Sequence, residues 1–301
     1  MYPTIFSLEI PFLGITLEPR FYGLFYAISV LIGARIVLSE VRRRSIPLTQ
    51  DEAMNCTLII FMAGLLGGRS YEVIFEWSNY YSHQPFWKVF AVWEGGMAIH
   101  GAIVLGPLAL VLYCWIKRIA LAAMLDISAF CIILGQAIGR WGNFTNGEAA
   151  GPVTGVWSGI VFPEGTAVDR YAQGQPVHPT MLYESLLNFI LFALLWKLRL
   201  RNFRDGMIGA LYLLGYAAIR SLLTPLRMDN QYLNFGDSKI LAPYAISVFM
   251  TLIALLWILK GKLWQQQPDL RGQVQDLRKP GRKTSKPVSY THLRAHETYD
   301  H

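Results

Sequence analysis

The chain has 301 residues, of which 53% are hydrophobic and 16% are charged. Apolar runs recur along nearly its whole length, which excludes one soluble globular domain and indicates an integral membrane protein. The formal net charge of +7 comes mainly from residues 260–301, which hold nine Lys or Arg against four Asp or Glu. A solvated tail beside anionic inner-leaflet lipids explains this surplus, so no nucleic-acid partner is expected.

The apolar runs are long enough to cross a bilayer as helices. A hydrocarbon core of about 30 Å needs about 20 apolar residues, and no water is present there to satisfy the backbone of an open strand. The predicted fold class is therefore all-α: a polytopic membrane protein with about seven transmembrane helices and a small outer-face loop region. The predicted spans are Phe21–Leu38, Cys56–Tyr71, Met97–Trp115, Leu121–Gly139, Met181–Trp196, Gly206–Leu223 and Ala242–Leu259.

Basic residues cluster in every second connection between these spans, which predicts that those connections are cytoplasmic. The N-terminus should then lie outside and the C-terminus in the cytoplasm, with the segments Ser78–Glu94 and Gly147–His178 facing the outer compartment. We therefore expect the function to reside on the outer side. The basic clusters are Arg42, Arg43 and Arg44; Lys117 and Arg118; Lys197, Arg199, Arg201 and Arg204; and Lys260 and Lys262.

Two parts of unequal size are expected along the chain. Residues 1–262 form the predicted integral membrane domain, with an outer loop region at about 147–178. Residues 263–301 form a predicted cytoplasmic basic tail with a disordered composition. Within this tail, residues 287–301 carry no apolar pattern and resemble a tail that recurs on unrelated translated sequences. We treat them as non-native and exclude them from functional reasoning.

A metal or redox centre is not expected. Cys56, Cys114 and Cys131 fall inside or at the ends of predicted spans without metal-ligand spacing, and none lies in an outer loop where oxidation would occur. The six histidines are scattered and form no pair with carboxylates or thiols at ligand spacing. The cysteines are interpreted as small packing residues.

The stretch Gly139–Glu148 is the most informative part of the chain, because it places charge and amides where an apolar run meets a polar loop. Arg140, Asn143, Asn146 and Glu148 follow one another at close spacings, several of them helical. An arginine at a membrane edge is costly unless it binds something anionic or polar. The stretch therefore predicts part of a lipid-headgroup site.

Polar groups in the other spans fall at the same depth once the spans are oriented. A single outer-leaflet cavity would explain them, whereas a transporter would place polar groups at the midplane within a repeated architecture. These groups are Tyr22, Arg69, His100, Arg140, His178, Glu184 and Arg220.

Tyr216, Arg220 and Arg227 are spaced by four and seven residues, which places them on one stripe of the sixth span until Pro225 disturbs the helix. The planar guanidinium groups suit a lipid phosphodiester. Two alternatives stay open: Arg220 pairs with a carboxylate such as Glu148 for structure, or Arg227 extends to the interface without binding substrate.

His100 lies at a helix start among glycines, where histidine is suited to moving a proton near neutral pH. A packed, hydrogen-bonded histidine is the alternative. The run Gly67-Gly68-Arg69 fits either a substrate site or a close contact between helices.

Together these residues resemble the prolipoprotein diacylglyceryl transferase family over about residues 20–260. The family signature Gly-Arg-x-Gly-Asn-Phe-x-Asn-Gly-Glu-x-x-Gly is met by Gly139–Gly151. The other matching motifs, in the family's order, are Tyr22-Gly23, Gly67-Gly68-Arg69, Gly95-Gly96-Met97 with His100-Gly101, His178-Pro179 with Leu182-Tyr183-Glu184, and Gly215-Tyr216 with Arg220.

The resemblance implies transfer of a diacylglyceryl group from phosphatidylglycerol to the lipobox cysteine of prolipoprotein signal peptides in the bacterial cytoplasmic membrane, without a cofactor. It makes His100 the base near the thiol, and Arg140 and Arg220 the residues that hold the phosphate. Further substrate-binding residues are expected at Tyr22, Arg69, Asn143, Asn146, Gly147, Glu148, Gly151, His178, Tyr183, Glu184, Tyr216 and Arg227.

Three positions depart from the family pattern, at Ala102, Thr145 and Thr224. Thr224 replaces a glutamate, and if that carboxylate normally holds Arg227, the arginine is expected to be free to move. A divergent paralogue with another acceptor therefore remains an alternative, as does a membrane protein that binds lipid or signal peptide without catalysis.

Overall fold

Seven long helices dominate the computed structural model, which describes residues 8–10, 15–17, 21–92, 95–228, 232–235 and 238–266. Each is long and apolar enough to cross a membrane. They are α1 (Phe21–Arg43), α2 (Gln50–Phe75), α3 (Ile99–Lys117), α4 (Leu121–Asn146), α6 (Thr180–Leu198), α7 (Met207–Leu223) and α8 (Ala242–Gly261). All seven predicted spans are confirmed. The predicted tail lies outside the described residues, apart from 263–266.

The remaining elements are short and lie at the ends of the helices. One antiparallel hairpin pairs β1 (Leu8–Ile10) with β2 (Ile15–Leu17), and another pairs β3 (Tyr232–Phe235) with β4 (Ser238–Leu241). Short helical turns η1 (Tyr81–His83) and η2 (Phe86–Phe90) precede α3, and α5 (Asp169–Ala172) lies in the loop between α4 and α6. The turn η4 (Thr224–Leu226) follows α7 directly. Within the described residues, the strands add these two hairpins to the predicted all-helical fold.

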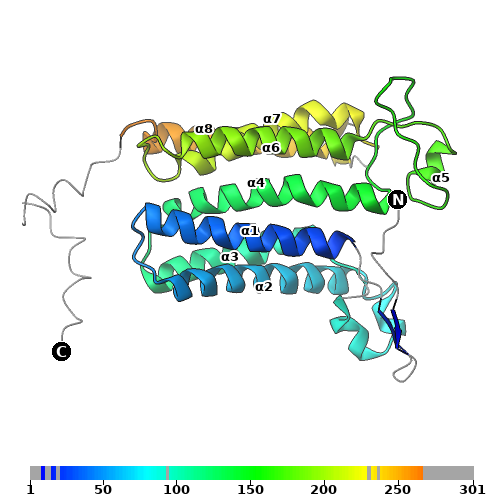
Figure 1. Ribbon diagram of the computed structural model, residues 1–301, viewed down its shortest axis with the longest axis horizontal. Coiled ribbons are helices and arrows are strands. Elements are labelled where there is room, and N and C mark those ends of the chain that lie inside the picture. The colour runs from blue at the N-terminus through cyan, green and yellow to red at the C-terminus, as the bar shows by residue number, and fades with distance from the viewer. Residues whose placement is uncertain are drawn as a thin grey trace, which may run out of the picture. The chain divides into compact units, whose positions relative to one another are not determined.

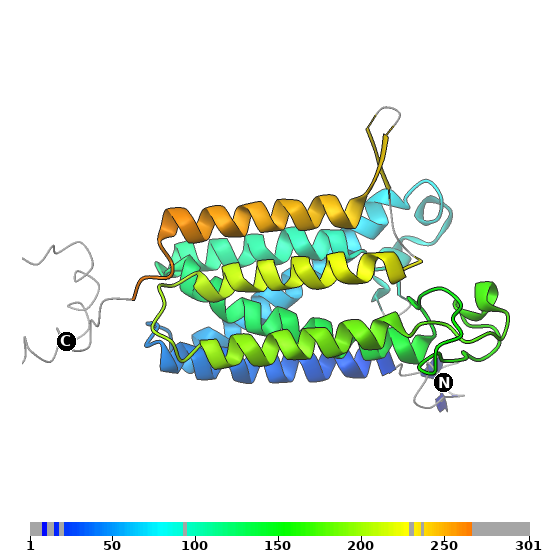
Figure 2. The same ribbon diagram turned by 90° about the horizontal axis from the view of Figure 1, so that it is seen from above.

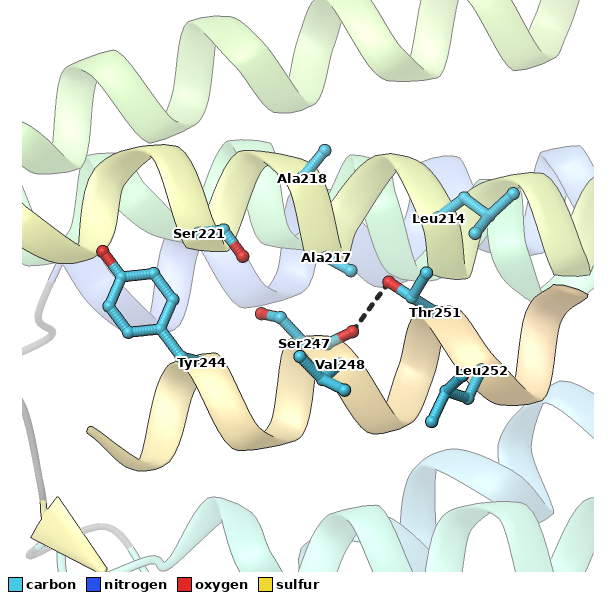
Figure 3. Close-up of a pocket in the computed structure, with 9 residues that line it drawn as sticks. All are labelled: Leu214, Ala217, Ala218, Ser221, Tyr244, Ser247, Val248, Thr251 and Leu252. Atoms are coloured by element: carbon cyan, nitrogen blue, oxygen red, sulfur yellow. Dashed lines mark hydrogen bonds between the residues drawn. The ribbon is translucent and has the colours of Figure 1, made fainter. Parts of the chain in front are cut away.

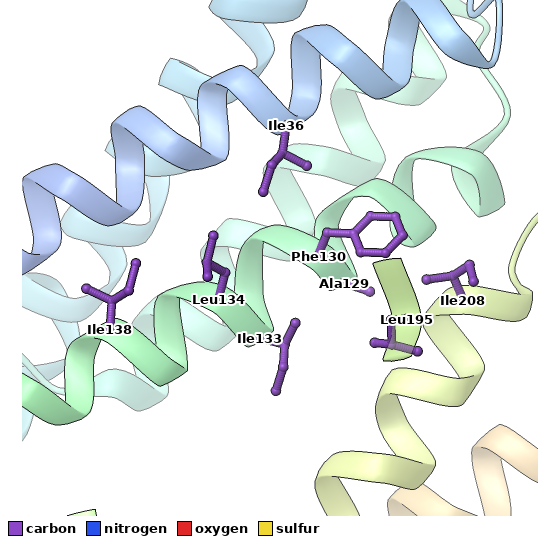
Figure 4. Close-up of a cluster of buried hydrophobic side chains, with 8 residues drawn as sticks. All are labelled: Ile36, Ala129, Phe130, Ile133, Leu134, Ile138, Leu195 and Ile208. Carbon is purple, nitrogen blue, oxygen red and sulfur yellow. The ribbon is translucent and has the colours of Figure 1, made fainter. Parts of the chain in front are cut away.

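The helices run alternately up and down, and α4 lies at the centre of the bundle (Figures 1 and 2). Helices α6 and α7 pack on one side of α4 and α1 on the other, while α2 and α3 form a hairpin and α8 packs on α7. The core around α4 contains side chains from four helices (Figure 4): Ile36, Ala129, Phe130, Ile133, Leu134, Ile138, Leu195 and Ile208. Large apolar side chains cover the outward helix faces, as lipid contact requires.

Buried charges join the helices at the end of the bundle where the basic clusters lie. Glu40 of α1 is fully buried and pairs with Arg43 at 2.6 Å and with Arg199 at 2.7 Å. Asp126 of α4 pairs with Arg44 at 2.9 Å and accepts hydrogen bonds from the backbone N–H groups that begin α7. The partial positive charge of a helix N-terminus favours such a carboxylate. These contacts set where α7 starts relative to α1 and α4.

The predicted end of the fourth span is wrong by two helical turns. Helix α4 continues past Gly139 to Asn146, and Gly147 ends it in the left-handed conformation with φ of 63°. Most of the signature stretch is therefore helical. Its polar residues continue a helix that packs on α6 and α7, so they remain on the protein side of α4 rather than in a free loop.

Candidate active site

A buried carboxylate at the start of α6 links two arginines from different parts of the chain. Glu184 is 1% exposed; its Oε1 atom accepts from Nη2 of Arg140 at 2.6 Å, and its Oε2 atom accepts from Nη1 of Arg227 at 2.7 Å. Arg140 comes from α4, and Arg227 follows α7. Charge-assisted bonds of this length are among the stronger hydrogen bonds in proteins. Glu184 therefore holds both guanidinium groups in fixed positions.

The last turns of α4 extend this network toward the loop. Nη1 of Arg140 donates to Oδ1 of Asn143 at 3.1 Å, three residues later on the same helix face. Nδ2 of Asn143 donates in turn to Oε1 of Glu148 at 2.9 Å. The left-handed backbone at Gly147 reverses the chain, so that the N–H of Glu148 reaches back to the carbonyl of Asn143 at 3.0 Å. The signature stretch thus builds one connected polar chain.

Helix α7 brings Tyr216 and Arg220 to the same group. The two residues are four apart on one helix face, and Tyr216 interacts electrostatically with Glu184, Arg140, Arg220 and Arg227. Three arginines against Glu148 and Glu184 leave one positive charge in this region. That balance matches the single negative charge of a phosphodiester.

The expectation that Arg227 is free to move is wrong. Thr224 is fully buried, and its hydroxyl donates to the carbonyl of Arg220 at 2.6 Å. This contact joins α7 to the turn η4, after which Arg227 is extended, with φ of −109° and ψ of 136°. The side chain of Arg227 is 5% exposed and pairs with Glu184. Glu184 therefore holds Arg227 without a carboxylate at position 224.

Tyr22 at the start of α1 lies against the signature stretch because Gly142 has no side chain. A Cβ atom at Gly142 would come within 2.5 Å of the Tyr22 ring. The same ring lies 5.0 Å from the ring of Tyr26 and interacts electrostatically with Glu148 and Arg140. The structure therefore places Tyr22 beside the polar residues of the signature stretch.

The loop between α4 and α6 folds back on the same end of the bundle. The N–H of Gly151 donates to the carbonyl of His178 at 2.8 Å, and a Cβ at Gly151 would lie 2.5 Å from the carbonyl oxygen of Leu226. A glycine is therefore needed where the loop meets η4. Tyr183 bonds Ser158 of the loop at 2.9 Å through its hydroxyl.

Two polar atoms near this contact lack a hydrogen-bond partner among the described residues. They are Oδ1 of Asn146 and Nδ1 of His178, and both are buried. Most buried polar atoms in native proteins are paired with protein groups or ordered water, so unpaired ones indicate a place where a polar ligand or water can bind. Both atoms are therefore available to a polar ligand or to water.

Arg69 and His100 belong to the separate α2–α3 hairpin at the same end of the bundle (Figure 1). Gly67 and Gly101 allow the two helices to touch, since a Cβ at Gly67 would lie 2.3 Å from the carbonyl oxygen of Gly101. The ring of His100 stacks on Tyr71 at 5.3 Å and is exposed, and the structure gives it no bond to the arginine cluster within the part it describes.

The guanidinium of Arg69 is 7% exposed and bonds backbone carbonyls, including those of Val89 at 2.8 Å and of Gly95 and Gly96 at 2.7 Å. It also lies over the Tyr81 ring at 5.2 Å. These contacts support the helix-packing interpretation of Gly67-Gly68-Arg69 and fix the segment that precedes His100. The predicted residues thus form two groups, one around Glu184 and one on the α2–α3 hairpin.

A model of the family described as prolipoprotein diacylglyceryl transferase matches residues 10–260. The chain belongs to the prolipoprotein diacylglyceryl transferase family. It is 41% identical over 216 residues to a protein of Parasynechococcus marenigrum, covering 70% of this chain and 76% of that one. A Gloeobacter violaceus protein is 35% identical over 252 residues, covering 83% and 92%, and one from Halalkalibacterium halodurans is 36% identical over 238 residues, covering 78% and 80%. All three are named phosphatidylglycerol–prolipoprotein diacylglyceryl transferase.

Two contacts that help to build the folded bundle were not predicted from the sequence. Asp126 connects α1, α4 and the start of α7, and its signal was a lone carboxylate inside an apolar run. Gly142 leaves room for the ring of Tyr22. In the sequence, this contact was indicated solely by the position of Gly142 within the signature. The bridging position of Glu184 also has no signature in the sequence, because its two partners lie 44 and 43 residues away.

Proposed function

We propose that this chain transfers the diacylglyceryl group of phosphatidylglycerol to the cysteine thiol of a prolipoprotein. The observation that carries the proposal is the pairing of Arg140 and Arg227 with the single buried Glu184, with Tyr216 and Arg220 beside them. This cluster has the charge to hold one phosphodiester, at one end of a bundle of membrane-spanning length. Family membership supports a prolipoprotein as the acceptor, and we assign the accepting group to its cysteine thiol.

In the proposed reaction, the cysteine sulfur attacks the glycerol carbon that bears the phosphate. A carbon–sulfur bond forms as the carbon–oxygen bond breaks, and glycerol phosphate leaves with the electron pair. The thiol loses its proton, which His100 accepts in this proposal. A cysteine with a pKa of about 8.5 is mostly protonated at neutral pH, so a base or a positive field is needed.

Negative charge grows on the phosphate as it leaves, and fixed cations stabilise that charge without reorganising. Glu184 and Asn143 hold Arg140 in place before substrate arrives. We assign phosphate binding to Arg140 and Arg220, and we assign to Arg227 the balancing of Glu184. No step requires a metal or an organic cofactor.

The other residues shape the site in this proposal. Tyr22 forms the wall of the site on the side of α1. Asn146 and His178 offer buried polar atoms that have no partner in the described residues. The contacts of Arg69 favour positioning of the loop before His100 over direct binding of lipid.

We further propose that the protein lies in the cytoplasmic membrane with this site at the outer leaflet. The basic clusters at the opposite end of the bundle support this orientation. The hydrocarbon tails of the lipid would stay in the bilayer, and a lipobox signal peptide would approach from the outer side.

The test uses the full chain in phosphatidylglycerol vesicles with a lipobox signal peptide, and mass spectrometry of the peptide cysteine. We expect a diacylglyceryl adduct with the wild type and its loss with His100→Ala and Arg140→Ala. Matched controls are His83→Ala and Arg118→Ala, which change an exposed histidine and an exposed arginine outside the cluster. Binding of peptide and lipid without any adduct would favour a non-catalytic binding protein and contradict the proposal.

A further inference from the structure

An open cavity of about 370 Å³ lies between α7 and α8, and its lining residues include none of the ion-paired cluster (Figure 3). Ala218 and Ser221 line it from α7, and Tyr244, Ser247 and Thr251 line it from α8. Ser221 directly follows Arg220, and Tyr244 lies near the start of α8. The cavity therefore begins beside the phosphate-binding arginine and runs along the helices toward the bilayer centre.

The cavity contains a hydroxyl without a hydrogen-bond partner in the described residues. Ser247 is 4% exposed, and its Oγ atom is unpaired, whereas Thr251 donates to the backbone carbonyl of Ser247 at 2.8 Å. In Figure 3 the side chains of Ser221 and Ser247 project from the two helices toward the space between them. A buried hydroxyl is costly when unpaired. An acceptor that enters the cavity would remove that cost.

The walls around these hydroxyls are mainly apolar, with Leu214, Val248 and Leu252 among them. Ordered water needs two to four polar partners, so it fits the hydroxyl end of the cavity and not its apolar length. A volume in this range lies at the small end of ligand sites, which are typically about 300–1,000 Å³. An apolar chain that carries one acceptor near its polar end fits both features.

We propose that the cavity holds one fatty acyl chain of the phospholipid, with its ester carbonyl accepting a hydrogen bond from Ser247. This inference rests on the proposed function, because the same lipid places its phosphate at Arg220. Adjacent residues of a helix point about 100° apart. Arg220 can thus bind the phosphate on one face of α7 while Ser221 borders the acyl chain on the next.

The first test adds bulk at the rim of the cavity with Ala218→Leu and compares it with Ala193→Leu, the same change at a likewise exposed alanine of α6 that does not line the cavity. With dipalmitoyl phosphatidylglycerol, Ala218→Leu should lower kcat/KM about tenfold, the effect of excluding roughly two methylene groups. With the dihexanoyl lipid the loss should be less than about twofold by the same argument, because the short chain does not fill the cavity. Equal losses with both lipids, or equal losses in both variants, would overturn the inference.

The second test removes the hydroxyl with Ser247→Ala and uses exposed Ser39→Ala as its control. Loss of one hydrogen bond should lower kcat/KM about fivefold for the ester lipid. The dialkyl ether analogue lacks the carbonyl, so the variant and the wild type should use it equally well. An identical loss with the ether lipid would contradict the assigned hydrogen bond.

Photo-crosslinking separates this inference from the proposed function. Phosphatidylglycerol with a diazirine in one acyl chain should label residues 214–221 and 244–252, and Ala218→Leu should reduce that labelling while Ala193→Leu should not. Labelling without transferase activity would refute the proposed reaction and leave the acyl site standing. Transferase activity without this labelling, or labelling there by a photoreactive signal peptide instead, would refute the acyl site alone.

Discussion

Replacing Glu184 with glutamine should destabilise the folded bundle, because one carboxylate holds two arginines. Its two hydrogen bonds are 2.6 and 2.7 Å long, and its side chain is 2% exposed. Breaking a buried ion pair by removing one partner costs about 3–5 kcal/mol. Glutamine keeps the shape and can still accept through its one amide oxygen, so we expect a loss of about 3 kcal/mol, at the lower end of that range. Unfolding in mixed detergent micelles would measure it.

The control is Glu164→Gln, which neutralises an exposed loop glutamate and should change stability by less than about 0.5 kcal/mol. A double-mutant cycle with Arg227→Gln isolates the pair. If the pairing is real, Glu184→Gln and Arg227→Gln together should cost clearly less than the two single losses added. A single-variant loss no larger than that of Glu164→Gln, or a strictly additive cycle, would refute the reasoning.

Three further substitutions test contacts that the fold creates. Gly142→Ala should displace the tyrosine ring that lies 2.5 Å from the added carbon and lower transferase activity, whereas Gly139→Ala, with nothing within 4 Å, should retain it. Gly101→Ala should separate the backbones of α2 and α3 and lower the free energy of unfolding by about 1–3 kcal/mol, as measured by thermal unfolding. Gly106→Ala on the same helix adds a carbon that meets nothing within 4 Å, so it should leave the free energy of unfolding unchanged. Asp126→Asn should cost about 3 kcal/mol or more by removing a buried ion-pair partner at the far end of the bundle, and an unchanged unfolding free energy would contradict this.

The lengths of the apolar runs predicted the membrane helices because the bilayer imposes a simple requirement on every spanning segment. The end of α4 was harder to predict, since Arg140, Asn143 and Asn146 interrupt the apolar pattern. Packing against α6 and α7 favours the helix through these residues, and the left-handed Gly147 ends it. Hydropathy alone does not contain that information.

The common depth of the site residues could also be predicted, because helices that alternate in direction bring Tyr22, Arg140, Glu184 and Arg220 to one end of the bundle. Which of these residues pair with one another could not be predicted. The sequence offered Glu148 as a carboxylate partner for Arg220, but it did not predict that Glu184 bonds both Arg140 and Arg227. That choice depends on which helix faces meet.

The amino-acid sequence by itself determined the family, the seven spans and the end of the molecule where polar residues gather, because these depend on composition, length and local motifs. Only the tertiary structure decided that Arg227 is held without a carboxylate at position 224, that Arg69 bonds a loop, and that α7 and α8 leave a cavity. Each of these depends on distances between residues far apart in the chain. Such distances are set by how the helices pack, and no local pattern encodes them.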